Sequence, residues 1–205
     1  MQTDTFTNLL SLVKGLTGNT AFTSSEETLV AQFINRRIYN AYRRSAYWPR
    51  YLVVGEARAA TDSVIPFTHA TLNSIDTFLR IYDAEPYVTN SVTEYEFLVT
   101  SDGARVLGNV SNAGTFYVDY KKRWDGDYNS TTNTNVPLEF FQYAAHAAFA
   151  DFLRYDGQNE KAAAEDAYAE GLLVLELENV MNQRNANTAA HRIRSHSTQQ
   201  VRYTR

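Results

Sequence analysis

Hydrophobic residues recur at helical spacing in the first quarter of the chain. Over residues 6–16 the apolar side chains follow steps of three and four, and glycines at 15 and 18 supply a stop. Residues 24–47 repeat this spacing behind a capping box from Ser24 to Glu27. Trp48-Pro49 ends the second segment, because a residue before proline is pushed out of the helical region. Two amphipathic helices are predicted here.

The pattern changes after residue 50 to short aromatic and β-branched runs. These runs cover residues 51–57, 64–67, 78–82, 95–99, 105–107 and 116–120. Asp102-Gly103 and Asn112-Ala113-Gly114 stand between runs and favour hairpin turns. A β-rich insertion over about 50–124 is therefore predicted, followed by a polar surface loop over 125–135.

Helical spacing returns after the loop in two further segments. Pro137 and Glu139 suit a first turn, Gly157 ends this helix, and the next helix begins near Asn159. The last helix carries a stripe from Ala164 through Leu175, and its neighbours widen the apolar face, which indicates cover on two sides. The bundle is expected to pack through Phe33, Ile34, Phe141, Phe152, Tyr168 and Leu172.

Together these patterns predict a mainly α member of the α+β class. The expected fold is a bundle of about four helices, with the β-rich insertion between helices two and three. We expect one domain over residues 1–186 and an extended C-terminal arm over 187–205. From Asn179 onward the chain has five arginines and no acidic residue, although its net charge is −4. An arm with so few apolar residues is expected to be disordered in the free monomer and to order against a partner.

The composition excludes several classes of protein. There is no cysteine, so disulfides, thiolate metal sites and cysteine nucleophiles are absent. No apolar run has the length of a membrane span, and the first residues lack the pattern of a signal peptide. We expect no membrane association, and use of the protein where it is made or in a particle assembled there. Fourteen tyrosines favour half-buried surfaces and interfaces.

Candidate chemistry is sparse. The four histidines are scattered, and His146 has no second ligand at helical spacing. The loop from Asp125 resembles a calcium loop, but Ser130 and Val136 occupy the positions of its glycine and glutamate, which favours a solvated loop. Neither a phosphate loop nor a Gly-x-Ser-x-Gly motif occurs. No catalytic, cofactor or metal site is predicted, and we expect a protein that is not an enzyme.

One basic cluster allows two interpretations. Arg36, Arg37, Arg43 and Arg44 are interleaved with Tyr39, Tyr42, Tyr47 and Trp48, an arrangement that could bind nucleic acid through phosphates and stacking. The acidic body opposes non-specific DNA binding, which favours a surface helix or a protein interface.

The order of elements resembles the head-to-tail adaptor (connector) proteins of tailed bacteriophages. Four stretches carry the resemblance: the capped helix SSEETLVAQFINRRIYNAYRRSAYWPRY, the insertion with IDTFLRIYDAEPY, EYEFLVTSDGARVL and TFYVDYKKRW, the helical pair from Val136 to Glu176, and the arginine-bearing tail. The resemblance implies a structural virion protein at the head–tail junction, made in the cytoplasm of the host bacterium. It implies a dodecameric ring under the portal protein that extends the DNA channel, passes packaged DNA without reading its sequence, and receives tail or nozzle proteins.

The resemblance also assigns residues to contacts. In the tail, it implies that four arginines pair with carboxylates of the portal: Arg192, Arg194, Arg202 and Arg205. In the insertion, the aromatic richness suggests an interface with neighbouring subunits or the tail, formed by Tyr82, Tyr95, Phe97, Phe116 and Tyr117. The alternatives are a nucleic-acid-binding protein that uses the basic helix and the basic tail, and an enzyme whose site the sequence does not reveal.

Overall fold

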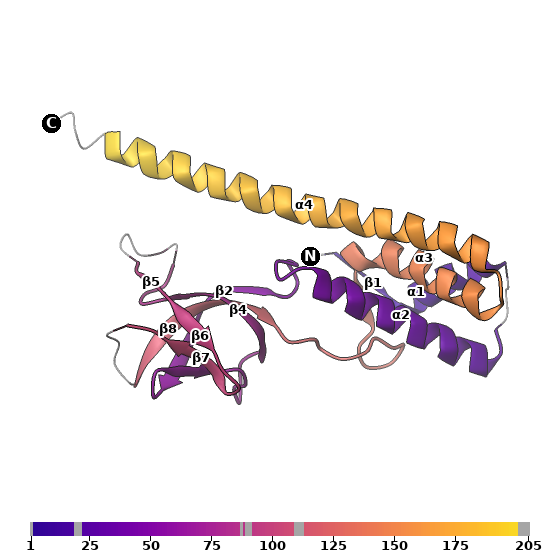
Figure 1. Cartoon of the computed structure of the whole chain (residues 1–205), viewed down its shortest axis with the longest axis horizontal. Coiled ribbons are helices and arrows are strands. Elements are labelled where there is room, and N and C mark those ends of the chain that lie inside the picture. The colour runs from indigo at the N-terminus through magenta and orange to yellow at the C-terminus, as the bar shows by residue number, and fades with distance from the viewer. Residues whose placement is uncertain (1, 19–21, 87, 89–91, 109–112, 201–205) are drawn as a thin grey trace. The chain divides into compact units, whose positions relative to one another are not determined.

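The chain folds into two compact units (Figure 1). A computed structural model describes residues 2–18, 22–86, 88, 92–108 and 113–200, with side chains other than those of 113 and 186–200. The helical unit combines Met1–Ser45 with Asp127–Arg205, and the β unit comprises Ala46–Gly126. Each unit is described by itself below.

The described residues of the helical unit form four helices and one small sheet. The helices are α1 (Phe6–Thr17), α2 (Ser24–Arg44), α3 (Leu138–Tyr155) and α4 (Asn159–Gln200). Strand β1 (Thr3–Thr5) pairs antiparallel with β9 (Asn135–Pro137), so that the start of the chain is joined to the end of the polar loop. The sequence did not predict these two short strands.

Local signals explain where the helices begin and end. The cap of α2 is Thr23, one residue before the predicted cap: its hydroxyl accepts from the Glu26 amide, and the Glu26 carboxylate accepts from the Thr23 amide. α1 ends at Gly18, whose φ of 71° is readily adopted only by glycine. Gly157, with φ of 79°, separates α3 from α4 as expected.

Helix α3 forms the centre of the helical unit. Five of its alanines are buried, which lets neighbouring helices approach closely: Ala144, Ala145, Ala147, Ala148 and Ala150. Of the six residues predicted to pack the bundle, Ile34 and Phe141 are buried, Phe33, Phe152 and Leu172 are half-buried, and Tyr168 is 55% exposed. The prediction is wrong for Tyr168.

The polar loop before β9 is fixed by a buried asparagine of α2. The side chain of Asn35 donates to the carbonyl of Tyr128 at 2.9 Å and accepts from the amide of Tyr128 at 2.7 Å. Tyr128 itself is buried. Both main-chain groups of one loop residue are therefore satisfied by one side chain, which holds the returning chain against α2.

In the part of the β unit that the structure describes, the strands form a seven-stranded antiparallel sheet. Its strands are β2 (Leu52–Thr61), β3 (Val64–Pro66), β4 (Ile75–Tyr82), β5 (Glu94–Tyr95), β6 (Phe97–Val99), β7 (Gly103–Val106) and β8 (Ala113–Lys122). The spatial order is β5-β4-β8-β2-β3-β7-β6. The two end strands are thus consecutive in the chain, and only Glu96 stands between them. The turn at Asp102-Gly103 is confirmed, and a Cβ at Gly103 would lie 2.0 Å from the Ile65 carbonyl oxygen.

The interior of the sheet is aliphatic and aromatic with one buried guanidinium. Ile65, Ile81 and Val118 are fully buried, with Phe78 and Phe116 beside them. Arg58 is 2% exposed; its Nη2 donates to the Tyr120 hydroxyl at 2.6 Å and lies 2.6 Å from Glu56 Oε2. Its Nε and Nη1 are buried with no hydrogen-bond partner.

The predicted mainly α class is wrong. Helices make up 45% of the chain, and the β region is a sheet with its own core rather than a minor insertion in a bundle. β2 and β8 each have ten residues because pairing extends the strands beyond their apolar runs. The extended arm is also corrected for residues up to Gln200: α4 continues to Gln200, and the alanines and arginines of this segment have high helix propensity.

Candidate interaction surfaces

Helix α4 buries a different face from the predicted one. The buried positions are Ala162, Ala169, Leu173 and Val180, which are spaced by seven, four and seven residues. The stripe read from the sequence placed Tyr168 and Leu175 inside, but they are 55% and 58% exposed. Alanines occupy two of these inner positions, Ala162 and Ala169, which allows a close approach to the buried alanines of α3.

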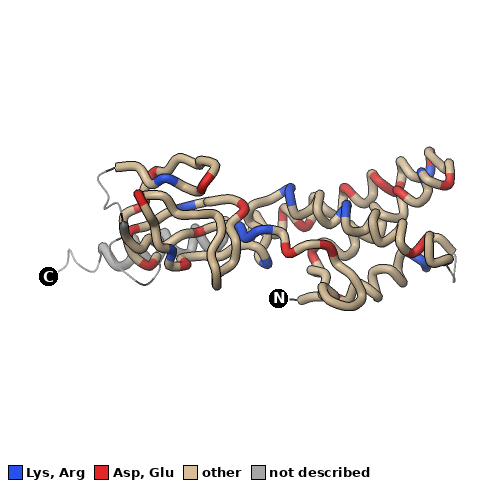
Figure 2. Tube along the Cα trace, turned by 90° about the horizontal axis from the view of Figure 1, so that it is seen from below, with Lys and Arg blue, Asp and Glu red and all other residues tan. Residues whose placement is uncertain are grey.

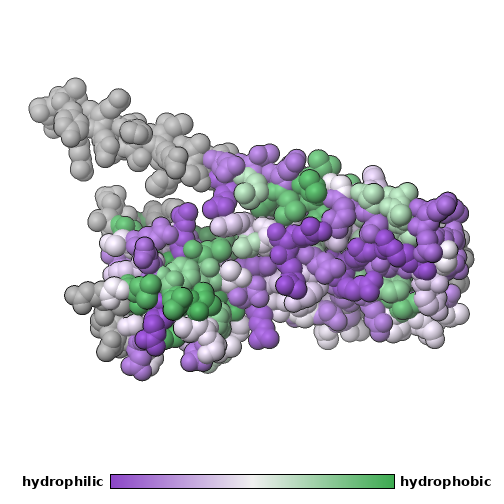
Figure 3. Space-filling view, in the orientation of Figure 1, coloured by the Kyte–Doolittle hydropathy of each residue, from purple (hydrophilic) through white to green (hydrophobic). Residues whose placement is uncertain are grey.

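The outer face of α4 is apolar where it should be polar. Between Ala163 and Leu175, no exposed position carries a charged side chain. The exposed residues are Ala163, Ala164, Ala167, Tyr168, Gly171, Val174 and Leu175, and we call this set the α4 outer face. Figure 3 shows apolar surface gathered over α4. An exposed apolar patch of this kind marks an interaction site in soluble proteins.

The charged residues of this stretch of α4 turn toward the neighbouring helices instead. Glu165 pairs with His146, whose ring also meets the Tyr168 ring edge-on with centroids 4.8 Å apart. Asp166 lies 2.6 Å from Arg154, and Glu170 lies 2.9 Å from Arg44. In Figure 2, acidic and basic residues are accordingly interspersed along the helices. These acidic side chains of α4 therefore form ion pairs with other helices of the unit and do not lie on the exposed outer face.

A carboxylate of α3 is the centre of these pairs. Asp151 is 6% exposed and accepts from Arg37 at 2.7 and 2.8 Å, and from Arg36 at 2.8 Å. Arg154 adds a third donor at 3.1 Å. Burial alone would raise the pKa of Asp151, but the hydrogen bonds from Arg37 and Arg36 outweigh it and lower that pKa. The pKa of Arg37 is raised by its hydrogen bond to Asp151.

Three of the four arginines in the basic cluster of α2 are therefore held in ion pairs. Arg36 and Arg37 are committed to Asp151 and Arg44 to Glu170, while Arg43 is exposed. A hollow of about 470 Å³ lies on this side, and its lining residues are Arg37, Asn40, Arg43, Arg44, Tyr143 and Glu170. Phosphate binding needs unpaired cations, so the ion pairs count against the nucleic-acid interpretation of this helix.

The aromatic residues predicted as an interface have a role inside the β unit. Tyr82 and Phe116 are buried at 7% and 6% exposure. Tyr95 packs edge-on against Phe116 with ring centroids 5.7 Å apart, and Phe97 and Tyr117 are half-buried. The sheet's own core accounts for most of the aromatic richness, so an interface formed by these five residues stays a prediction.

Sequence reasoning missed the apolar residues that are exposed on this sheet. Leu98 is 58%, Val99 55% and Leu107 42% exposed. Figure 3 shows apolar surface in this region, over β6 and β7. The signal was available: the run from Glu94 to Val99 becomes continuously apolar at its end, which an alternating strand with one wet face does not do.

The tail arginines are placed only in part. Arg192 and Arg194 lie in α4, so their backbone is helical. Arg202 and Arg205 lie outside the described residues. Their proposed pairing with a portal therefore stays a prediction.

Nothing in the described ranges gathers into a reactive centre. His69 accepts from the amides of Thr71 and Leu72 within a turn, and His146 is engaged by Glu165. In the loop after Asp125, the side-chain oxygen of Asn129 accepts hydrogen bonds from the amides of Thr131 and Thr132. Across the described residues, no three His, Cys, Asp or Glu side chains are grouped to hold a metal ion. None of the helices there has the length and apolarity needed to cross a bilayer.

Comparison with models of known protein families gives no match, and comparison with curated proteins gives no significant match.

Proposed function

We propose that this chain is a structural virion protein, the head-to-tail adaptor of a tailed bacteriophage. In this proposal, copies assemble as a ring under the portal protein, and the ring extends the DNA channel and receives tail or nozzle proteins. The protein has no catalytic role, and DNA passes through the ring without sequence-specific contacts. The α4 outer face supports the proposal most directly, together with the resemblance of the element order to this family.

The α4 outer face is suited to contact with a neighbouring copy. Fully burying an exposed Val or Leu side chain contributes about 1.5–3 kcal/mol. Tyr168, Val174 and Leu175 are each about half exposed, so covering the three supplies part of that amount for each side chain. Small residues on the same face, Ala163, Ala167 and Gly171, allow a second helix to approach closely. A ring requires a heterologous contact, in which this face meets a different surface of the next copy.

The basic end of α4 is suited to the portal. Arg192 and Arg194 lie two residues apart on a helix, and Arg202 and Arg205 follow in the sequence. Guanidinium groups bind carboxylates in a bidentate manner, which gives geometric specificity as well as affinity. We propose that these four arginines bind acidic side chains of the portal ring.

The first experiment tests the ring. Purified chain is mixed with a portal from a related phage system, and the assembly is measured by mass photometry. Val174→Glu with Leu175→Glu should abolish ring formation while leaving the circular dichroism of the monomer unchanged, because both side chains are exposed. Asn185→Glu, at an exposed position of α4 beyond the apolar stretch, is the matched control and should assemble normally. Unimpaired assembly of the double variant would overturn the role of this face.

The second experiment separates portal docking from nucleic-acid binding. A chain truncated after Ala186 lacks four of the five tail arginines and should lose portal attachment without a change in melting temperature. DNA binding by the full and truncated chains is measured by electrophoretic mobility shift with double-stranded DNA. Tight DNA binding with a steep salt dependence, lost on truncation, would support the nucleic-acid alternative instead.

A further inference from the structure

Strand β6 has one edge with no partner strand among the described residues, and we call it the free edge. Strand β6 stands at the end of the strand order and pairs with β7, with Phe97, Leu98 and Val99 opposite Val106, Arg105 and Ala104. The free edge is on the side on which the preceding strand β5 pairs with β4. The amide of Leu107 donates to Glu96, and the amide of Thr100 donates to the Gly103 carbonyl. In an antiparallel ladder the direction of these bonds alternates, so Leu98 also faces β7.

The main chains of Phe97 and Val99 therefore face away from β7. Their amides and carbonyls have no partner strand in the part of the chain that the structure describes. Native sheets guard such edges with charged side chains, above all lysine, with proline, with bulges or with very short strands. The segment from Glu94 to Val99 has no lysine or proline. Strand β6 has only three residues and Glu94 and Glu96 precede it, but Leu98 and Val99 are more than half exposed.

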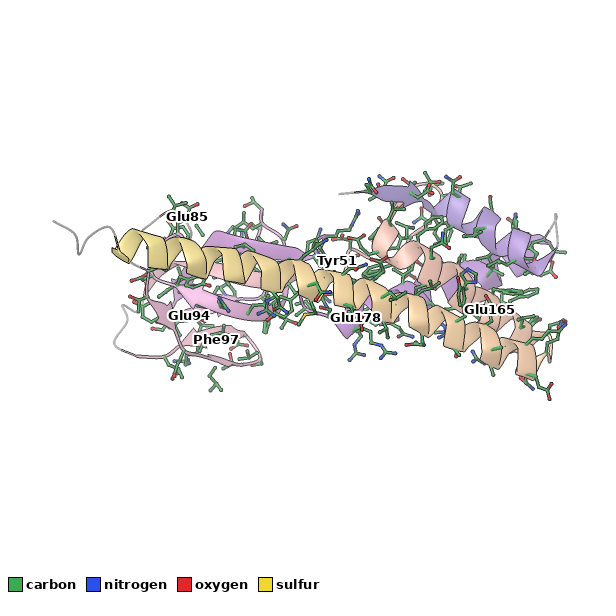
Figure 4. The ribbon with its side chains drawn as sticks, turned by 90° about the horizontal axis from the view of Figure 1, so that it is seen from above. Tyr51, Glu85, Glu94, Phe97, Glu165 and Glu178 are labelled. Carbon is green, nitrogen blue, oxygen red and sulfur yellow. The ribbon has the colours of Figure 1, made fainter. Side chains whose placement is uncertain are left out.

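Acidic side chains accompany the apolar ones at this edge. Glu94, Tyr95, Glu96, Phe97 and Leu107 line a hollow of about 540 Å³. Figure 4 labels Glu94 and Phe97, which belong to β5 and β6. The nearest described cation to Glu94 is Arg80, at 3.8 Å, and both side chains are about half exposed. Glu96 is exposed and has no ion pair among the described residues.

We propose that the free edge of β6 binds an extended segment of a partner protein by strand addition. The main chain of that segment pairs with Phe97 and Val99, its apolar side chains cover Leu98 and Leu107, and its lysines or arginines face Glu94 and Glu96. Pairing of β6 with β6 of a second copy is disfavoured, since it would bring the acidic segments of both copies together. This inference does not depend on the ring proposed above, because it concerns only the β unit.

The test uses the full chain and a displayed library of random linear peptides. Enriched peptides should alternate apolar residues with Lys or Arg, and their synthetic forms should bind in fluorescence anisotropy. Leu98→Asp should weaken binding about tenfold or more, equivalent to at least about 1.4 kcal/mol. Glu94→Gln with Glu96→Gln should weaken binding and flatten its salt dependence. Val54→Asp, at an exposed position of β2, is the matched control and should bind as wild type.

N-methylation identifies strand addition itself. Methyl groups on alternate amides of a selected peptide should abolish binding in one register and spare it in the other, because only every second amide faces β6. Failure of the library to enrich any sequence, or equal binding by Leu98→Asp, would overturn the proposal. So would a wild-type dimer that Leu98→Asp dissociates, since the occupant would then be a second copy. Stronger peptide binding after truncation at Ala186 would identify the chain's own basic tail as the occupant and would also overturn it.

Discussion

The helical unit and the β unit each bury a carboxylate, and they stabilise it in opposite ways. Asp151 of α3 accepts from three arginines, and its pKa is lowered. Asp119 of β8 accepts from the Gly55 amide at 2.8 Å and the Tyr82 hydroxyl at 3.2 Å, and burial raises its pKa because these neutral donors do not compensate fully. Two carboxylates of similar burial thus have pKa values shifted in opposite directions, because one has charged hydrogen-bond donors and the other has neutral ones.

The difference extends to the surfaces. The helical unit pairs Glu165, Asp166 and Glu170 of α4 with residues of its other helices and leaves the α4 outer face apolar. The β unit uses aliphatic and aromatic packing for its interior, with Arg58 and Lys121 as buried cations, and keeps glutamates beside its apolar edge. The first surface suits a broad apolar contact with another helix, and the second suits a narrow strand with basic side chains.

Removing a core ring should produce the largest difference between the units. Phe78→Ala should destabilise the β unit by about 3–5 kcal/mol, since Phe78 is 6% exposed and packs on Phe67 and Phe97. Both tryptophans, Trp48 and Trp124, lie in this unit, so urea unfolding followed by tryptophan fluorescence reports on it. The helical signal at 222 nm should shift much less. Coincident shifts of both signals would show that the two units unfold as one.

The next largest effect should appear in the helical unit. Asp151→Asn should cost about 3 kcal/mol, because it leaves Arg37, which is 12% exposed, without its main partner. Urea unfolding followed at 222 nm measures the loss. Asp156→Asn is the control, since Asp156 is exposed. The cost should begin to shrink below about pH 4 and disappear only as pH falls through the lowered pKa of folded Asp151, because a lowered pKa contributes stability that is fully present above the unfolded value. A cost that persists in acid would show that charge is not its cause.

A smaller effect is expected in the loop around Tyr128, where the chain enters the helical unit after the β unit. Asn35→Ala should cost about 2 kcal/mol, because it leaves the amide and the carbonyl of Tyr128 without their partner. Hydrogen exchange should accelerate at Tyr128 but not at strand β8. Asn40→Ala, at an exposed position of the same helix, serves for comparison and should leave both unchanged.

The smallest effect concerns the sign of pH dependence. Because the pKa of Asp119 is raised, its contribution is present below the unfolded value and is lost as pH rises through the folded one. Asp119→Asn should therefore gain β-unit stability relative to wild type as pH rises from about 4 to 7. Tryptophan fluorescence in urea series at several pH values measures the difference. A wild-type advantage that grows with pH would contradict the assignment.

The sequence predicted where the elements lie better than which of their faces is buried. All four helices and the main strands appear near their expected positions, because apolar periodicity and turn residues are local signals. The buried face of α4 was missed because Ala162 and Ala169 carry little hydrophobicity, and only the alanines opposite them in α3 make those positions internal. The free edge of β6 depends on strand order, which no local pattern contains. The sequence predicted that α4 is covered on two sides. Its own unit covers one side, and we propose that a neighbouring copy covers the other.

The β unit interrupts the helical unit, and this has a consequence for the order of synthesis. A ribosome completes α1 and α2 first, yet their main partner α3 follows only after residues 46–126. As an unfolded loop of about 80 residues, this stretch would oppose the joining of its ends by roughly 4 kcal/mol. Once folded it removes that penalty, because β2 and β8 pair next to its two ends and Leu52 lies opposite Lys121. We therefore expect the β unit to fold first during synthesis, and α1 and α2 to pack against α3 and α4 afterwards.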